Sequence, residues 1–495
     1  MSLKREVAHG LKWQAISIGG SQLLSLVVVT TLARLLEPSA FGLVSLIGVY
    51  LGFVTMLVDQ GIVMALIQRK DLRREHIDAA FWFNLGCALL LCLSTVVLAG
   101  SVASLLNEPR LVRLLRWSSL GLVIGASSEI HATLFTKAMD FRRPVIRGLI
   151  GSAVGGTVGV GMALGGCGVW SLVGQQLAGA GAGAVFLWSM STYRPSLRVS
   201  LPHLRELFGL SSSAFVISML WYFASRFDQI VIGRFAGTPA LGLYAVAGKL
   251  PNLAKLVSGQ PVATVALPTM SRLQGDHGTM RRAIYQGMEL NAVVSFAVFV
   301  GIAATASDLM AVLFGGKWGG AAMLCSLLSL YSLVEGLQVF CYPALLATAG
   351  IRRYVGLCVC KVAGVAVVSL VGIQFGVAYV VAGLTLNSLV FGVPGLVLLR
   401  KRIGLSPLEY CKPCLAPALA SLIMVGVIRL MSPMLPAGSI AALPLACKAL
   451  VGASVYVGCL LLLDPAVVKK LGDTIAHAFR RHDILRAAAL GSAAE

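Results

Sequence analysis

Long apolar stretches recur along this sequence, and their length restricts its fold more than any other feature. A helix that crosses a bilayer needs about 20 mainly apolar residues, because each residue rises ~1.5 Å through a hydrocarbon layer of ~30 Å. Lipid offers no hydrogen-bond partners, so such stretches are predicted to be helices. Fourteen stretches qualify, near residues 13–36, 41–67, 81–105, 115–136, 145–167, 169–190, 207–232, 241–267, 287–314, 321–348, 354–375, 377–399, 414–431 and 441–463.

The composition excludes most soluble classes of protein. Charged residues make up only 12% of the 495 residues, against ~25% in typical soluble domains, and hydrophobic residues make up 57%. A soluble enzyme and a disordered chain both need more charge than this. The 11 cysteines are mostly scattered through apolar stretches, which argues against a secreted disulfide framework. We therefore predict an all-α polytopic membrane protein with about fourteen transmembrane helices.

Basic residues predict the orientation in the membrane. The chain has 40 Lys and Arg against 20 Asp and Glu, and 28 of the 40 fall on the side of the N-terminus. The opposite side carries seven: Arg34, Arg110, Arg113, Arg116, Arg234, Lys317 and Arg429. The positive-inside rule then places the N-terminus in the cytoplasm, and an even number of spans places the C-terminus there too. Topology and anionic membrane lipids account for the charge, so no nucleic-acid partner is expected.

A weak internal repeat predicts two related halves. A shift of 200 residues aligns four identities, pairing Arg34, Ala40, Gly42 and Leu43 with Arg234, Ala240, Gly242 and Leu243. Blocks of six spans insert with the same orientation, so they would be related by a pseudo-two-fold axis along the membrane normal. The predicted parts are a six-helix lobe at 1–193, a second at 194–402, an extra helix pair at 403–463 and a basic cytoplasmic tail at 464–495.

Six segments between the first span and about residue 350 carry a family resemblance: Phe81–Leu85, Gly166–Val173, Asp228–Arg234, Leu241–Tyr244, Leu267–Gln274 and Gly315–Trp318. They resemble segments of the oligosaccharide flippase (polysaccharide transport, Wzx-like) family. This family belongs to a superfamily that also contains multidrug/toxin extrusion transporters and lipid II flippases. The resemblance implies an exporter of lipid-linked oligosaccharides that works by alternating access and has no catalytic residues.

The leading hypothesis is a flippase for polyprenyl-diphosphate-linked oligosaccharide in the bacterial inner membrane. It would serve the synthesis of exopolysaccharide, capsule or lipopolysaccharide, with a polysaccharide polymerase and export machinery as further partners. The alternatives are a cation-coupled multidrug efflux transporter and a membrane polymerase or ligase, although the latter usually needs a sizeable periplasmic loop. No phosphate-binding Gly-x-x-x-x-Gly-Lys-Ser/Thr loop is present, and the isolated Cys411-x-x-Cys414 is a poor metal site. We expect no cofactor or metal.

Span ten carries a polar stripe through an otherwise apolar helix. Its residues are spaced at i, i+4, i+7 and i+11, and they are Tyr331, Glu335, Gln338 and Tyr342. Such residues lie on one face of a helix. Aromatic rings stack on sugars and the polar groups bond hydroxyls, so the stripe is a candidate glycan site. The alternative interpretation is a stripe that packs against another helix through hydrogen bonds.

Spans seven and eight carry candidate ligands for the diphosphate, because charges within a membrane span often face a cavity or a partner. These are Tyr222 and Arg226 in span seven, and Lys249, Asn252 and Lys255 in span eight. Pro251 and Pro261 are predicted to kink span eight. Snorkelling, or pairing with Glu335, is the alternative for the lysines. Asp228 is expected to form an ion pair near Arg234.

Three acidic residues are candidates for coupling transport to a proton or sodium ion: Asp59, Glu129 and Glu335. The alternative for these carboxylates is an ion pair with Lys137 or a cap at the level of the lipid headgroups. The glycines between Gly148 and Gly168 are expected to serve close helix packing.

Overall fold

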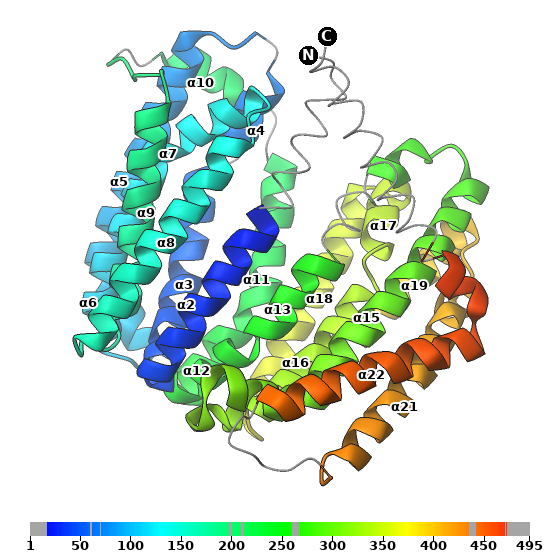
Figure 1. The fold of residues 1–495 in the computed structure, drawn as a ribbon. Coiled ribbons are helices and arrows are strands. Elements are labelled where there is room, and N and C mark those ends of the chain that lie inside the picture. The colour runs from blue at the N-terminus through cyan, green and yellow to red at the C-terminus, as the bar shows by residue number, and fades with distance from the viewer. Residues whose placement is uncertain are drawn as a thin grey trace, which may run out of the picture. The chain divides into compact units, whose positions relative to one another are not determined.

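Helices account for every regular element in the part of the chain that the structure describes. The structure is a computed structural model that describes residues 17–59, 62–69, 71–197, 200–208, 212–259, 266, 268–434, 442–470 and 472. Figure 1 labels the helices in chain order. Residue contacts divide the chain into two compact units. The first unit comprises Met1–Val246 and Val365–Val377, and the second comprises Ala247–Gly364 and Ala378–Glu495.

The first unit contains the elements from η1 to α12. They are η1 (Ser17–Ser21), α2 (Gln22–Leu35), α3 (Pro38–Asp59), α4 (Ile62–Gln68), α5 (Arg74–Leu105), α6 (Leu111–Ser118), α7 (Leu120–Lys137), α8 (Arg142–Leu164), α9 (Trp170–Met190), α10 (Leu201–Phe208), α11 (Ser212–Phe235) and α12 (Gly237–Ala247).

The second unit contains most of the remaining elements, and the last turns of α18 belong to the first unit. They are α13 (Lys249–Ser258), α15 (His277–Phe314), η2 (Gly316–Trp318), α16 (Gly320–Gly336), α17 (Cys341–Ala349), α18 (Ile351–Gly372), α19 (Val377–Ile403), α20 (Pro407–Cys411), η3 (Lys412–Cys414), α21 (Leu415–Met431) and α22 (Ala442–Leu463).

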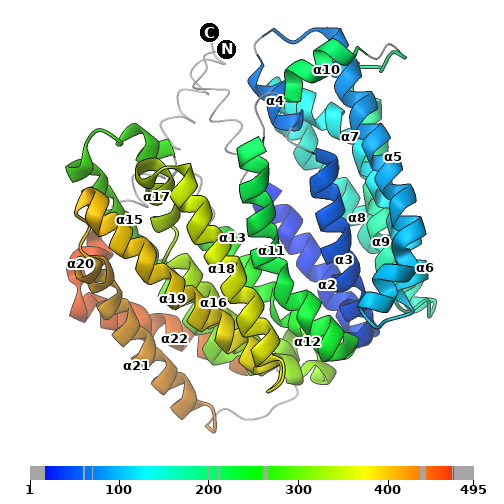
Figure 2. The ribbon, with the colours of Figure 1, turned by 180° about the vertical axis from the view of Figure 1, so that it is seen from behind.

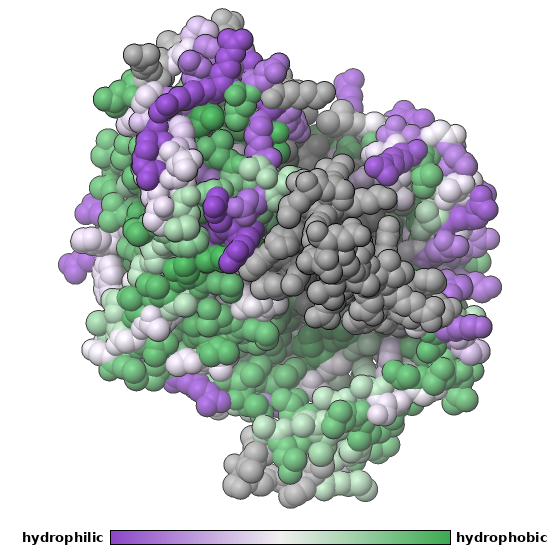
Figure 3. Space-filling model, turned by 45° about the horizontal axis from the view of Figure 1, so that its top comes forward, coloured by the Kyte–Doolittle hydropathy of each residue, from purple (hydrophilic) through white to green (hydrophobic). Residues whose placement is uncertain are grey.

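Each of the fourteen predicted spans coincides with one or two of these helices, which confirms the all-α polytopic fold. Within the described ranges, nine helical segments are long and apolar enough to cross a membrane. Spans eight and ten each consist of two helices rather than one. On the face shown in Figure 3, hydrophobic side chains cover broad areas, as lipid-facing helices require.

The limits predicted for the two six-helix lobes stay a prediction. The predicted extra pair contains α21 and α22, which pack against each other and against α15. A buried lysine joins them, because Lys448 Nζ donates to Asp308 Oδ2 of α15 at 2.8 Å and to Ser432 Oγ at 2.9 Å. The predicted tail lies outside the described residues except for 464–470 and 472.

Glycines bring α8 and α9 into backbone contact, as the sequence predicted. A Cβ built on Gly155 would lie 2.5 Å from the carbonyl oxygen of Gln175. A Cβ on Gly151 would lie 2.9 Å from the carbonyl oxygen of Gly179, and one on Gly179 would lie 2.7 Å from that of Gly151. Real Cβ atoms cannot approach backbone this closely, so the two helices depend on small residues for their spacing.

An ion pair holds α10 against the loop after α4. Glu206 accepts from Arg69 Nη2 at 2.5 Å, and its Oε2 atom lies 3.4 Å from His76 Nε2. The hydrogen bonds from Arg69 and His76 hold the pKa of the Glu206 carboxyl below its ordinary value of 4.5. The ion pair therefore stabilises the position of α10 most strongly when Glu206 is ionised.

Glu206→Gln is expected to loosen α10 at neutral pH. A carboxyl whose pKa is lowered by folding contributes stability above its unfolded pKa and loses it as the pH falls through the folded value. The difference between wild type and Glu206→Gln should therefore be largest near pH 7 and should shrink below about pH 4.5. Hydrogen exchange of the α10 amides at several pH values measures this difference between the two proteins. A difference that grows on acidification would contradict this account.

Candidate functional site in the second unit

The helix of span ten is interrupted at residues 337–340, between α16 and α17. The interruption frees backbone carbonyls that lipid could not satisfy. Asn291 Nδ2 of α15 donates to the carbonyl of Gly336 at 3.0 Å, and Tyr410 Oη of α20 donates to that of Leu337 at 2.5 Å. Side chains from two other helices therefore support the break. The prediction of one continuous stripe-bearing helix is wrong at this point.

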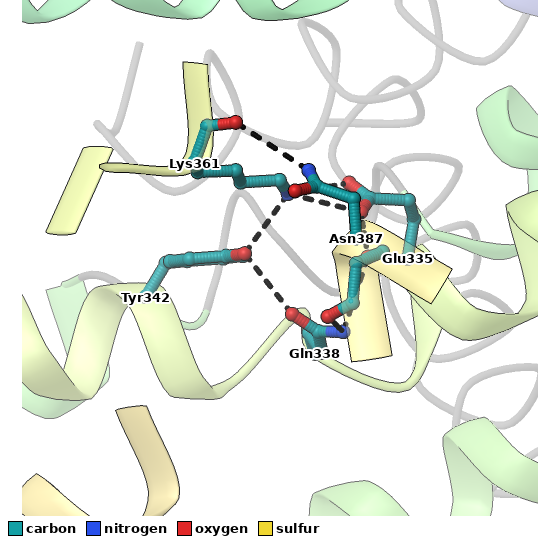
Figure 4. Close-up of polar contacts among 6 residues, drawn as sticks. Glu335, Gln338, Tyr342, Lys361 and Asn387 are labelled. Atoms are coloured by element: carbon teal, nitrogen blue, oxygen red, sulfur yellow. Dashed lines mark hydrogen bonds and ion pairs between the residues drawn. The ribbon is translucent and has the colours of Figure 1, made fainter. Parts of the chain in front are cut away.

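A buried ion pair lies beside the break (Figure 4). Lys361 of α18 donates from Nζ to Glu335 Oε1 at 2.9 Å and to Oε2 at 3.2 Å. The side chain of Lys361 is 7% exposed and that of Glu335 is 20% exposed. Removing two charges from water costs several kcal/mol per ion, so the pair needs additional hydrogen bonds to be stable.

Those additional hydrogen bonds come from α17, α19 and the interruption itself. Lys361 Nζ also donates to Tyr342 Oη at 3.0 Å, and Tyr342 Oη donates in turn to Gln338 Oε1 at 3.0 Å. Gln338 Nε2 donates to the carbonyl of Ser388 at 2.8 Å. Ser388 Oγ donates to Glu335 Oε1, which closes the ring of contacts. All three protons of the lysine and both oxygens of the glutamate thus have partners.

Glycines allow the helices to approach this network. A Cβ on Gly364 of α18 would lie 2.0 Å from Asn387 Oδ1 of α19, and Asn387 Nδ2 donates to the carbonyl of Lys361 at 3.4 Å. A Cβ on Gly392 would lie 3.0 Å from Gln338 Nε2. The network is therefore enclosed by close backbone packing as well as by hydrogen bonds.

A small recess adjoins Lys361 and Tyr342. It is lined by Gln338, Cys341, Tyr342, Leu345, Leu357, Cys358, Lys361, Phe391, Gly392 and Gly395. The space open to the centre of a water molecule is about 20 Å³, which is enough for one water and too small for a sugar. Chemically, the recess can admit water or a proton to a paired lysine and carboxylate.

The predicted glycan stripe divides into two groups in the structure. Glu335, Gln338 and Tyr342 contact one another or the same partners in the buried network, as the packing alternative described. Tyr331 lies one turn before Glu335 and faces a different group, because Lys255 Nζ lies 5.0 Å from the centre of its ring. This is a cation–π distance.

The predicted diphosphate residues of span eight lie on α13, after an interruption of the helix. The helix is interrupted at Gly248, three residues before Pro251. Lys249 and Asn252 are exposed on α13, and Lys255 is half-buried against α16. Pro261 lies outside the described residues. The described part of span eight thus carries two lysines and an asparagine on one short helix.

The predicted residues of span seven belong to the first unit. Tyr222 donates to the carbonyl of Val49 on α3 and packs on Phe53, with ring centroids 6.5 Å apart. Arg226 is exposed, one turn further along α11. Asp228 accepts from Tyr244 Oη of α12 and is 5% exposed. The expected ion pair of Asp228 near Arg234 is therefore wrong, because the buried tyrosine hydroxyl is the partner instead.

The coupling candidates of the first unit have different surroundings. Glu129 Oε2 lies 3.6 Å from Arg147 Nη1 of α8, so its partner is not Lys137. Lys137 donates instead to the carbonyls of Leu66 at 2.6 Å and Arg69 at 2.5 Å, at the end of α4. The side chain of Asp59 lies outside the described residues.

Sequence analysis missed Lys361, Ser388 and Asn387 as site residues. A lysine in the middle of an apolar span was the available signal for Lys361, since such charges require a partner. Ser388 and Asn387 gave no such signal, because single small polar residues are common in transmembrane helices. Only the tertiary structure brings α16, α18 and α19 together around them.

Comparison with known proteins agrees with the fold. The chain matches the family described as "Polysaccharide biosynthesis protein" over residues 31–323. It is 28% identical over 326 residues to the succinoglycan biosynthesis transport protein ExoT of Rhizobium meliloti (strain 1021), covering 66% of each chain. It is 25% identical over 360 residues to the lipopolysaccharide biosynthesis protein WzxC of Escherichia coli (strain K12), covering 71% of this chain and 69% of that protein. The chain thus matches about two thirds of the length of these relatives.

Solved structures share the arrangement of helices. The lipid II flippase MurJ in an inward closed conformation aligns with a TM-score of 0.73 at 14% identity, over 92% of this chain and 99% of that chain. An inward-facing multidrug resistance transporter of the MATE family aligns with a TM-score of 0.64 at 16% identity, over 77% of this chain and 94% of that chain. These likenesses concern the fold alone. Since the family match spans residues 31–323, more than half of the chain, this protein belongs to the polysaccharide biosynthesis protein family.

Proposed function

We propose that this protein is a flippase for polyprenyl-diphosphate-linked oligosaccharide. It carries the lipid-linked glycan from the inner to the outer leaflet of the bacterial inner membrane, with both of its termini in the cytoplasm. The glycan is then used by a polysaccharide polymerase and export machinery to build a surface polysaccharide. The family match, to proteins named for polysaccharide biosynthesis and transport, supports this function, and the flippase carries out no covalent chemistry.

The observation that carries the proposal is the set of polar side chains that α13 presents. Lys249 and Asn252 are exposed there, and Lys255 lies over the ring of Tyr331. Lysines bind phosphate as point charges, and a ring beside them can stack on the first sugar. We therefore assign Lys249, Asn252 and Lys255 to the diphosphate and Tyr331 to the glycan. Arg226, exposed on α11 beside Tyr222, is proposed as a further diphosphate ligand from the first unit.

The Glu335–Lys361 pair is proposed as the ion-coupling group. Protonation of the carboxylate would release Lys361 from Glu335, while Tyr342, Gln338 and Ser388 keep the surrounding helices bonded. The adjoining recess, lined in part by Lys361, has room for one water molecule. Gln338 and Tyr342 are then supports of this pair rather than sugar ligands, while Asp59 and Glu129 remain further coupling candidates.

Substitution of the diphosphate residues is expected to reduce transport without unfolding the protein. A lost charge-assisted hydrogen bond costs about 1.5–3 kcal/mol, which corresponds to a ~10- to 100-fold weaker interaction. Lys249→Ala and Arg226→Ala should each reduce flipping of a lipid-linked oligosaccharide in proteoliposomes by that factor. Lys412→Ala, at an exposed lysine in η3, is the matched control and should transport normally.

The same assay distinguishes the other functions. Unaltered lipid-linked glycan in the opposite leaflet is the result expected of a flippase. A product of changed mass would instead identify a polymerase or ligase. A drug-susceptibility panel in cells tests multidrug efflux, and resistance without glycan transport would overturn the proposal. Wild-type flipping by both alanine variants would remove Lys249 and Arg226 from the site.

A further inference from the structure

The short helix α6 has one buried face and one charged face. Its three leucines are at most 2% exposed, and the helix packs against α5, α7 and α9. Arg113, Arg116 and Trp117 are all exposed. They are spaced at i, i+3 and i+4, so they lie together on one side of the helix. The helix thus presents two guanidinium groups and an indole ring away from the core of the first unit.

The charged face lies at the end of the first unit where basic residues are not expected. Figure 2 shows α6 beside the end of α5 that is farthest from α4 and α10. The positive-inside rule predicts that this end is the outer one. Arg110, Arg113 and Arg116 are three of the seven basic residues predicted for the outer side of the whole chain. Topology does not account for this cluster, so another interaction must favour it.

Two of these arginines lack an acidic partner within the protein. Glu108 Oε1 lies 3.9 Å from Arg110 Nε, so the nearby carboxylate is paired with the first arginine of the cluster. Arg116 donates from Nε to the carbonyl of Val96 in α5 at 3.3 Å. Among the described residues, neither Arg113 nor Arg116 forms an ion pair. Since a guanidinium has five N–H donors, most of the donors of these two side chains can bind an external anion.

The surface beside these arginines is apolar. Leu93 and Val97 of α5 are 66% and 71% exposed, next to Val96, whose carbonyl Arg116 contacts. Exposed leucine and valine on a membrane span face the acyl chains of lipids. Trp117 is 57% exposed, and tryptophan is enriched where the hydrocarbon meets the headgroups. A charge at such a place is costly unless an anion neutralises it.

We propose that Arg113, Arg116 and Trp117 form a binding site for the headgroup of an anionic phospholipid. The planar fork of an arginine binds two phosphate oxygens at once, and the indole ring lies at the level of the headgroup. The apolar strip of α5 that contains Leu93 and Val97 takes the acyl chains. An acidic protein would suit the arginines but not the lipid-facing side chains beside them, which favours a lipid. The site does not depend on the flipping proposed above.

Quenching of tryptophan fluorescence by brominated lipids tests the site in the full-length protein. The difference in emission between wild type and Trp117→Phe isolates Trp117 from the other tryptophans among the seven. Both proteins are reconstituted in phosphatidylcholine vesicles that contain brominated phosphatidylglycerol or, in a parallel series, brominated phosphatidylcholine. We expect the phosphatidylglycerol to quench Trp117 at a ~10-fold lower mole fraction, because each arginine at a membrane surface favours anionic lipid by roughly fivefold.

Substitution of the two arginines should remove this preference. Arg113→Gln with Arg116→Gln eliminates both charges and keeps side chains that form hydrogen bonds. Arg352→Gln with Arg353→Gln removes the same charge from exposed positions in α18, and this matched control should leave the quenching of Trp117 unchanged. Arg113→Gln alone should lower the preference by roughly fivefold. This single variant carries the test if the double variant does not fold.

Three results would overturn the inference. One is equal quenching of Trp117 by the two brominated lipids, and another is a preference for phosphatidylglycerol that survives the double substitution. Quenching by neither lipid would show that Trp117 does not face acyl chains, and it would point to an acidic protein as the occupant. Since none of these measurements requires transport, a protein that binds phosphatidylglycerol here but flips no lipid-linked glycan would contradict the proposed function alone.

Discussion

Lys361→Ala is expected to destabilise the protein by about 3–5 kcal/mol, because it leaves the Glu335 carboxylate buried without its counter-ion. Lys361 Nζ is the donor to both oxygens of Glu335, and Ser388 Oγ is the remaining donor recorded for that carboxylate among the described residues. Thermal unfolding of the detergent-solubilised protein, followed by a thiol-reactive dye, measures the loss. The melting temperature should fall by several degrees or more.

Removing both charges separates the ion pair from the shape of the site. Lys361→Met with Glu335→Gln leaves no buried charge and keeps a hydrogen-bonding group for Ser388, so stability should recover to within about 1 kcal/mol of wild type. Coupled transport should still be lost, because the double variant has no titratable carboxylate. Lys412→Ala removes an exposed lysine of η3 and should leave the melting temperature unchanged. A double variant as unstable as Lys361→Ala would contradict this explanation.

Gly155→Val is expected to cost about 3 kcal/mol or more, since it forces α8 away from α9. The Cβ of the new side chain would lie 2.5 Å from the carbonyl oxygen of Gln175 and 3.2 Å from the Cα of Gly179. Both contacts are with backbone, which cannot rotate aside as a side chain can. The same unfolding assay, together with the yield of monodisperse protein, checks the prediction.

Gly161→Val is the matched control for this substitution. Gly161 lies in the same helix, is exposed, and a Cβ there meets nothing within 4 Å. Both variants place a β-branched residue within α8, so the difference between them reports on helix packing rather than on helix propensity. If Gly155→Val and Gly161→Val lose the same amount of stability, the close backbone contact between α8 and α9 is not the reason why Gly155 is needed.

The sequence predicted the membrane-spanning helices well, because apolar length is a local property. Each of the fourteen apolar stretches coincides with helical structure, and Pro251 correctly indicated the interruption of span eight. The repeat of 200 residues was visible in Gly42 and Gly242, although nothing in the sequence showed that each contacts the other's helix. The limits of the two lobes and the residues of the substrate site stay predictions.

The chain's own chemistry thus determined that it spans a membrane as helices, since a backbone in lipid must satisfy its polar groups within each segment. Which buried charges pair was decided by the tertiary structure alone. Glu335 lies on a helix with an apparent sugar-binding stripe, yet its partner, Lys361, comes from α18, 26 residues along the chain. Helical spacing describes neighbours within one helix, whereas the partner of a buried charge depends on which helices pack together. Which helices pack together depends on contacts such as the one between Gly364 of α18 and Asn387 of α19, and these contacts form only in the folded protein.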